Sequence, residues 1–322
     1  KSKEKKQIQA ILSSDKKIWN IVQKELHEID EKFGDKRRTK IKTIELVEYN
    51  AEDFIEHEDA YLVLSKNGWL RKFKTVVESG TLKYKENDSL LETVKANTRE
   101  FVAFFTSRGM VYVFKLYNLP YTRAGFGEPV QNLFKFADGE KVISMLSLDP
   151  AELAAAGQTH STGDSSNKST RQTRLSFADD NKGGLEGMII GSSGYGFRFP
   201  LSNLIETTRS GRKLMTLKGN DKIVGFSLIT GDHLFMASVS GKGIVIPIEQ
   251  VSLLTGAGMG SRLIKLTNSS LAGFKVTNKN GHSTITLEDG KTKKINIKDI
   301  RVTNRGGQGI IISKRKKITA VE

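Results

Sequence analysis

Apolar residues near the start of the chain recur at the spacing of an α-helix. Between residues 18 and 33 they are separated by four, four, three and four positions, which forms one stripe on a 3.6-residue period. The stripe consists of Ile18, Val22, Leu26, Ile29 and Phe33. Ser14 is a favourable N-cap, and Gly34 stands where helices commonly end in a left-handed residue. We therefore expect a helix here, preceded by a shorter helix around residues 8–12.

From about residue 44 the pattern changes to short apolar runs that break at glycines. Each run leads into a turn and a second strand, which often carries basic residues, and this unit occurs five times. The turn glycines are Gly68, Gly109, Gly194, Gly241 and Gly290. The pattern predicts five β-hairpins.

The spacing of these glycines predicts a propeller. The intervals are 41, 85, 47 and 49 residues, and a repeat of about 40–50 residues is typical of a four-stranded blade. The long interval holds either two blades or one blade with an insertion. Residues 151–185 have the composition of a loop. We therefore expect five four-stranded blades with a flexible insertion near 151–185, with six blades as the alternative.

The chain is expected to have two parts. Residues 1–43 form a helical segment and linker, and residues 44–322 form an all-β, propeller-like domain. Residues 35–40 are polar and resemble a boundary, so the apolar stripe is expected to pair with a segment outside this chain. The first residue is Lys1 and not Met, which suggests a fragment of a longer protein.

Composition narrows the function classes. The 322 residues contain no cysteine, which excludes disulfides, thiol catalysis and thiolate metal sites. No apolar run reaches the ~18 residues that a membrane span needs, so we expect a cytoplasmic protein without a membrane partner. Of the net charge of +15, residues 188–322 contribute +13, from 21 basic and 8 acidic side chains. Such an excess favours a polyanionic partner, above all nucleic acid, over a merely soluble basic surface.

No constellation for catalysis is recognisable. The five histidines are scattered, and the acidic residues between 53 and 59 are interpreted as a solvated loop rather than a metal site. Nucleotide-binding, serine-hydrolase and zinc-protease motifs are absent. The glycine run at 255–260 is interpreted as a turn between blades. We therefore expect neither catalytic nor metal-binding residues in this chain.

Several segments together carry a family resemblance. A helix is followed by residues 34–41 (GDKRRTKI), an acidic stretch at 52–59, residues 63–72 (VLSKNGWLRK) and residues 125–133 (GFGEPVQNL). This ordered series resembles the A subunit of bacterial type IIA DNA topoisomerases. It is similar to the junction where the coiled-coil part of the breakage-reunion domain ends and the C-terminal DNA-wrapping domain begins.

The resemblance implies a β-pinwheel, a propeller-like disc whose blades exchange hairpins and whose basic rim bends double-stranded DNA. It places the catalytic tyrosine in the preceding domain, so none of the seven tyrosines here is given that role. It also implies a parent enzyme that is an ATP-dependent isomerase of the nucleoid, whose partner is a B (ATPase) subunit and whose role lies in chromosome segregation. ATP and Mg²⁺ would bind that enzyme's other domains, and no cofactor is expected in this chain.

One marker separates the two branches of the family. The gyrase branch carries a heptad close to Gln-Arg-Arg-Gly-Gly-Lys-Gly in the first blade, which negative supercoiling requires. The matching residues 76–85 contain no such heptad, and a partial likeness, residues 303–309, lies in the last blade. We therefore favour topoisomerase IV, with gyrase as the alternative. A protein-interaction propeller is a third interpretation, which would show no salt-sensitive DNA affinity.

Candidate DNA-binding residues are cations on or beside the second strand of each hairpin and in the turns between blades. Because side chains alternate between the faces of a strand, only one of two adjacent cations is expected to face DNA. The candidates are Arg71, Lys72, Lys115, Arg123, Arg198, Arg209, Arg212, Lys213, Lys242, Arg262, Lys293, Lys294 and Arg305.

Overall fold

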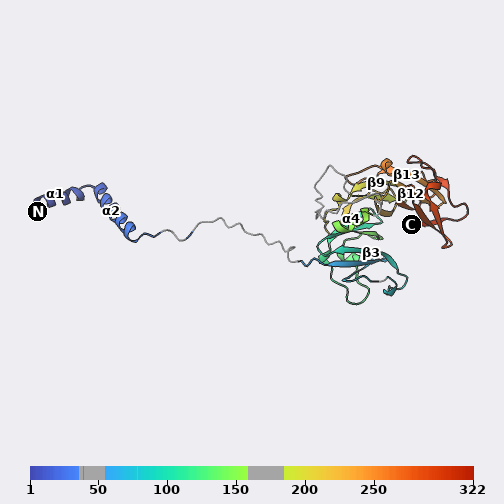
Figure 1. Cartoon of the computed structure of the whole chain (residues 1–322), viewed down its shortest axis with the longest axis horizontal. Helices are drawn as coiled ribbons and strands as arrows, with labels where there is room; N and C mark the ends of the chain where they lie inside the picture. Colours follow the sequence, from blue (N-terminus) through green and yellow to red (C-terminus); the bar gives the residue numbers. More distant parts are fainter. Residues whose placement is uncertain (36–38, 40–54, 78, 159–184) are drawn as a thin grey trace, which may run out of the picture. The chain divides into compact units, whose positions relative to one another are not determined.

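The structure, a computed structural model, describes residues 1–35, 39, 55–77, 79–158 and 185–322. The chain divides into two compact units, residues 1–50 and 51–322 (Figure 1). The boundary expected between residues 43 and 44 lies outside the described residues.

The first unit contains the two predicted helices, α1 (Ser2–Leu12) and α2 (Asp15–Phe33). The expected end of α2 is right in position and wrong in conformation. Gly34 is extended, with φ −67°, and its amide donates to the carbonyl of Asp30 at 2.7 Å. The apolar stripe of α2 faces solvent in the described chain, since Leu26 is 60% and Phe33 is 79% exposed.

The second unit consists of antiparallel sheets, each built on one predicted hairpin. The hairpins are β1–β2 (Asp59–Ser65, Trp69–Phe73), β4–β5 (Phe101–Thr106, Met110–Lys115), β8–β9 (Glu186–Gly191, Tyr195–Pro200), β12–β13 (His233–Ser238, Lys242–Pro247) and β16–β17 (His282–Leu287, Thr292–Asn296). A third strand follows each hairpin and pairs with its first strand. These third strands are β3 (Leu90–Asn97), β7 (Val142–Ser147), β11 (Ile223–Leu228), β15 (Leu271–Thr277) and β19 (Ile318–Val321). The described residues therefore form five sheets, which confirms the five-blade propeller.

A fourth strand reaches each of the first four sheets from the repeat that follows. These two-residue strands pair with the second strand of the preceding hairpin. They are β6 (Glu128–Pro129), β10 (Arg212–Lys213), β14 (Ser261–Arg262) and β18 (Ile310–Ile311). We call the stretches that contain them the exchange segments: residues 122–130, 207–214, 254–263 and 303–312. The fifth sheet has three strands among the described residues, so the expectation of four strands in every blade is wrong there.

The core lies between consecutive sheets rather than inside any one of them. In β4, Val102 and Phe104 pack towards the first sheet, while Ala103 and Phe105 pack towards the third. A strand buried on both faces lacks the polar alternation of a half-exposed strand. That burial explains why each hairpin begins with a continuous apolar run, the pattern by which the sequence identified the repeats.

Part of the predicted insertion forms a helix. Residues Pro150–Gln158 form α4, and Leu153 on this helix is buried in the core between the second and third sheets. The loop expected at the start of the insertion is therefore wrong for these residues. The remainder, residues 159–184, lies outside the described residues.

Packing against an exchange segment should make one turn glycine more sensitive to replacement by alanine than another. Gly241 (φ +90°) and Gly290 (φ +76°) both have a left-handed backbone, so alanine costs each about 1–3 kcal/mol in backbone strain. A Cβ at Gly241 would also collide with the carbonyl oxygen of Ser313, beside the exchange segment, whereas at Gly290 it meets open space. We expect urea denaturation to show that Gly241→Ala loses at least about 1 kcal/mol more stability than Gly290→Ala. Equal losses would contradict tight packing of this segment.

Candidate nucleic-acid interface

Contacts between neighbouring sheets show which edge of each sheet lies inside the domain and which lies outside. The third strands of neighbouring sheets lie side by side: β3 with β7, β7 with β11, β11 with β15, and β15 with β19. They are therefore the inner strands. The second hairpin strands and the exchange segments lie at the opposite edge of each sheet, and we call this edge the rim. All thirteen predicted cations lie on or next to it.

Seven of the thirteen candidates are exposed at the rim. They are Arg123, Arg209, Lys213, Arg262, Lys293, Lys294 and Arg305. Each exchange segment contributes one exposed arginine, so the same charge recurs at every junction between successive sheets. A row of cations at regular junctions can contact successive phosphates of a backbone without reading bases.

Three of these arginines are held in place by neighbouring groups. Arg209 donates from Nε to the carbonyl of Leu133 at 3.1 Å, and Arg305 donates from Nη1 to the carbonyl of Gln250 at 3.3 Å. Arg262 donates to the hydroxyl oxygen of Tyr195 at 3.1 and 2.9 Å. A guanidinium group has five N–H donors, so each retains donors for a phosphate while its position is partly fixed.

Four further candidates are half-buried: Lys115, Arg198, Arg212 and Lys242. Arg198 is engaged internally, since its Nη1 lies 2.9 Å from Oε2 of Glu186 and its Nε donates to the carbonyl of Val251 at 3.0 Å. The ammonium of Lys115 lies 5.5 Å from the centre of the Phe101 ring. These contacts make Arg198 and Lys115 weaker phosphate ligands than the exposed set.

Two candidates, Arg71 and Lys72, are buried, at 4% and 2% exposure. The expectation that one of them faces DNA is wrong, because both cations are enclosed by the protein. Arg71 donates to the carbonyl of Lys83 at 3.1 Å, and its guanidinium lies 5.0 Å from the centre of the Tyr84 ring. The sequence alone predicts a surface position for both residues, because cations on a strand usually lie there.

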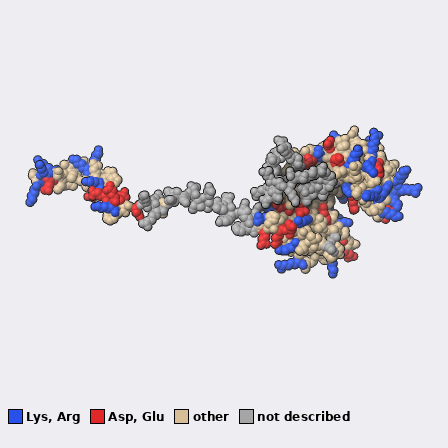
Figure 2. Space-filling model, in the orientation of Figure 1, with Lys and Arg blue, Asp and Glu red and all other residues tan. Residues whose placement is uncertain are grey.

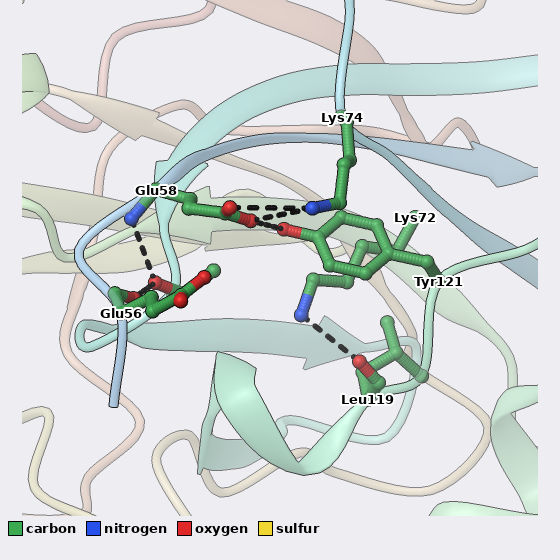
Figure 3. Close-up of polar contacts among 7 residues, drawn as sticks. Glu56, Glu58, Lys72, Lys74, Leu119 and Tyr121 are labelled. Carbon is green, nitrogen blue, oxygen red and sulfur yellow. Dashed lines mark hydrogen bonds and ion pairs between the residues drawn. The ribbon is translucent and has the colours of Figure 1, made fainter. Parts of the chain in front are cut away.

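Lys72 joins the first sheet to the second repeat (Figure 3). Its ammonium donates to the carbonyls of Leu116 and Leu119 at 3.1 and 2.9 Å, at the two ends of the 3₁₀ turn Leu116–Asn118, and lies 4.4 Å from the centre of the Tyr121 ring. Its backbone amide donates to Oγ1 of Thr122 at 3.2 Å. Burial lowers the pKa of Lys72 from 10.5 to about 8. The charge of Glu58 opposes this lowering of the pKa, and the charge of Lys74 adds to it.

A second polar group surrounds the same ring. Figure 3 shows the carboxylate of Glu58 facing both the ammonium of Lys74 and the hydroxyl of Tyr121. The Tyr121 hydroxyl donates to Oε2 of Glu58 at 3.1 Å, and Lys74 Nζ lies 3.1 Å from the same atom. The bonds from Lys74 and then Tyr121 lower the pKa of Glu58, while burial and the carboxylate raise the pKa of Tyr121 to about 12. These contacts fix the start of the exchange segment that carries Arg123.

Some exposed cations were missed by the sequence reasoning. Lys66, Lys135 and Lys141 line a hollow of about 600 Å³, and Lys66, Lys141 and Lys222 line one of about 440 Å³. Lys141 and Lys222 each directly precede an inner strand and end a short charged turn, residues 137–141 (ADGEK) and 218–222 (KGNDK). The recurrence of this turn was the available signal. Figure 2 shows that lysines and arginines also gather at the end of the second unit that contains the C-terminus.

The described residues hold no group of three or more histidine, aspartate or glutamate side chains able to bind a metal ion. Among the same residues, no helix is both long and apolar enough to cross a membrane.

Comparison with family models gives one match. The model described as "DNA gyrase C-terminal domain, beta-propeller" matches residues 100–149, 188–230, 232–278 and 288–318. These ranges begin in the second sheet and extend into the fifth, so they follow the repeats of the fold.

Relatives of two kinds are similar to the chain. It is 24% identical to the DNA gyrase A subunit of Dehalogenimonas lykanthroporepellens, over 95% of this chain and 42% of the relative. It is 27% identical to the DNA topoisomerase 4 A subunit of Escherichia coli K12, over 99% of this chain and 40% of the relative. The chain therefore spans about two fifths of the length of these relatives.

Two solved structures share the fold. The C-terminal domain of DNA topoisomerase IV superimposes with a TM-score of 0.65 at 17% identity, covering 83% of this chain and 78% of that structure. The ParC C-terminal domain of E. coli gives a TM-score of 0.61 at 22% identity, covering 82% of this chain and 98% of that structure.

The buried ammonium of Lys72 predicts a pH dependence of stability. Lys72 has a pKa of 10.5 when unfolded and about 8 when folded, so between these values the unfolded chain binds more protons. Stability should therefore rise with pH across this window, by up to about 3 kcal/mol. Lys72→Met should abolish this rise relative to the wild type in denaturation curves measured from pH 7 to 10.5. A parallel rise in both proteins would contradict it.

Proposed function

The chain belongs to the DNA gyrase C-terminal domain family, the β-pinwheel domains of type IIA topoisomerase A subunits, and on that premise we propose that its rim binds and bends double-stranded DNA. The observation that carries the proposal is the exposed arginine in every exchange segment, which repeats a phosphate-binding group along the rim. The +13 net charge of residues 188–322 supports it. Bending a short duplex costs on the order of 1–6 kcal/mol, which the added contacts would offset.

We propose further that the domain serves topoisomerase IV, presenting a duplex for strand passage in decatenation and relaxation. The absence of the gyrase heptad from residues 76–85 supports this choice. The partial likeness at residues 303–309 belongs to the exchange segment of the fourth sheet and not to the first hairpin. Gyrase-type wrapping, which supports negative supercoiling, is the alternative.

In this proposal the chain is the non-catalytic part of an ATP-dependent isomerase. The B (ATPase) subunit would be its partner, ATP and Mg²⁺ would act in other domains, and the enzyme would work on the nucleoid in the bacterial cytoplasm during chromosome segregation. The helices of residues 1–43 would continue the preceding coiled coil. These assignments rest on the family and on relatives that are longer than this chain.

DNA binding by the rim should depend steeply on salt. Each neutralised phosphate adds about 0.9 to the slope of log affinity against log salt concentration. With about five contacts from the exposed set, we expect a slope steeper than about −4 and little sequence preference, measured by fluorescence anisotropy with short duplexes. A slope near −1 would refute the proposal and favour a protein-interaction propeller.

Removing rim charges should flatten this dependence. Arg123, Lys213 and Lys242 make no hydrogen bond through their side chains to described residues, so glutamine should leave the fold intact. The triple variant R123Q/K213Q/K242Q should lower the slope by about 2.7. The matched control K16Q/K24Q/K32Q removes the same charge from exposed positions of α2 and should change the slope by less than about 1. Equal effects of the two variants would mean that charge alone, not the rim, governs binding.

Ligation of nicked circles in the presence of the chain distinguishes the two enzymes. A domain of the topoisomerase IV kind should bend DNA without trapping writhe, so the circles should close with little change in linking number. Gels that resolve topoisomers measure the outcome. Positive writhe that grows with the number of bound molecules would overturn the choice in favour of gyrase.

A further inference from the structure

The fifth sheet has an outer edge without a partner in the described chain. Its outer strand, β17, pairs only with β16 there. Thr284 of β16 exchanges backbone bonds with Glu322 beside β19, at 2.6 and 2.7 Å. Since Lys294 lies opposite Thr284, and antiparallel pairs alternate in the direction of their bonds, the amide and carbonyl of Lys294 point away from β16, towards the rim.

In the other four sheets the equivalent edge is filled at two points. The carbonyl of the turn glycine accepts a bond from an apolar residue of the exchange segment, as Gly241 does from Ile312 at 2.9 Å. The residue four positions after the glycine accepts a second bond, as Val245 does from Thr303 at 2.9 Å. The same pairs of acceptors are Gly68 and Lys72, Gly109 and Val113, and Gly194 and Arg198.

The corresponding positions of the fifth sheet are Gly290 and Lys294. Within the described residues no hydrogen bond reaches the carbonyl of Gly290 or the backbone of Lys294. A Cβ added at Gly290 would meet nothing within 4 Å, whereas at each of the other four turn glycines it would meet the exchange segment or the residue that follows it. The fifth sheet therefore presents the same two backbone carbonyl acceptors at its outer edge, and no described segment bonds to them.

Lys294 also carries the same kind of side chain as its counterparts in two other sheets. Lys72 and Arg198, at the same place in the first and third sheets, each donate to the carbonyl of the residue that ends a 3₁₀ turn in the next repeat, Leu119 and Val251. Lys294 is exposed and makes no such bond among the described residues. Its ammonium is free to meet an acceptor on an incoming segment.

The four occupied edges define what such a segment looks like. Its first bonding residue is threonine in three of the four cases, its second is Val, Leu or Ile seven to nine positions later, and glycine lies between them. The pairs of bonding residues are Thr122 and Val130, Thr207 and Leu214, Leu254 and Leu263, and Thr303 and Ile312.

The positive charge along this edge favours some segments of this pattern over others. Lys291, Lys293 and Lys294 are all exposed at or beside the free edge, and lysines on an edge strand oppose pairing with a copy of the same edge. They attract a strand with acidic residues at its variable positions. A second copy of this chain is thereby disfavoured, and a different polypeptide is favoured.

We propose that the free edge of β17 is a docking site for a partner protein, which adds an extended segment to the sheet. The segment has the pattern of the exchange segments, threonine and then Val, Leu or Ile seven to nine positions on, with acidic residues between. Main-chain bonds to Lys294 and Gly290 supply affinity, as in other cases of strand addition, and the lysines supply selectivity.

The test uses a labelled peptide with the sequence of residues 302–313 carrying R305E and Q308E. We expect saturable binding to the full chain by fluorescence anisotropy, about threefold or more tighter than the peptide without these substitutions, because two rim charge pairs are gained. Hydrogen exchange should show slower exchange of the Lys294 amide when the peptide is bound. Absence of both effects would overturn the proposal.

Two variants separate backbone pairing from charge. Lys294→Pro removes the amide donor and should abolish binding, while Lys294→Thr keeps the amide and should weaken binding only about threefold. Should Lys294→Pro fail to fold, amide exchange in the wild type still decides. Weak binding that Lys294→Pro leaves unchanged, protection of Lys294 only by DNA, or dimer formation in sedimentation would each overturn the proposal, since each assigns the edge another role.

Discussion

The fold depends on one recurring constraint: a sheet in this domain is completed by the repeat that follows it. Each of the first four hairpins leaves the turn glycine's carbonyl and one outward-facing residue without partners, and the exchange segment of the next repeat supplies them. Buried or partly buried backbone groups need such partners. The exchange segments therefore tie the sheets to one another, and their exposed arginines are placed at the rim by the same bonds that hold the sheets together.

The residue four positions after each turn glycine is of two kinds, an apolar residue that packs or a cation that also donates a hydrogen bond. In the second and fourth sheets it is a buried valine, Val113 or Val245. In the first and third it is Lys72 or Arg198, each of which donates to a carbonyl of the next repeat. A cation at this place links two repeats by a directional bond, where valine only packs. Lys72 is enclosed so completely that its charge is costly, which is why its pKa falls to about 8.

Much of the architecture could be predicted from the sequence because it rests on local signals. Gly68 and Gly241 mark turns with a left-handed backbone, and strands buried on both faces read as apolar runs, so the five hairpins were correct. The exchange strands were not located, because two-residue strands that pair across 58 to 103 residues leave no periodic pattern. Lys72 was misplaced because its burial depends on a segment contributed by the second repeat. Arg71 was misplaced because Lys83 and Tyr84 of its own repeat fold over it, with Gly127 of the exchange segment beside it.

Strand exchange also has a consequence for synthesis on the ribosome. The outer strand of the first sheet, β6, lies after the second hairpin, and β10, β14 and β18 likewise each lie after the hairpin of the next repeat. A nascent chain emerges from its amino terminus. Each of these sheets therefore stays unfinished after its third strand until the chain has grown by another 31 to 65 residues. During synthesis each of these sheets is therefore completed only after the next repeat has been translated. A pause within one repeat leaves the preceding sheet without its outer strand.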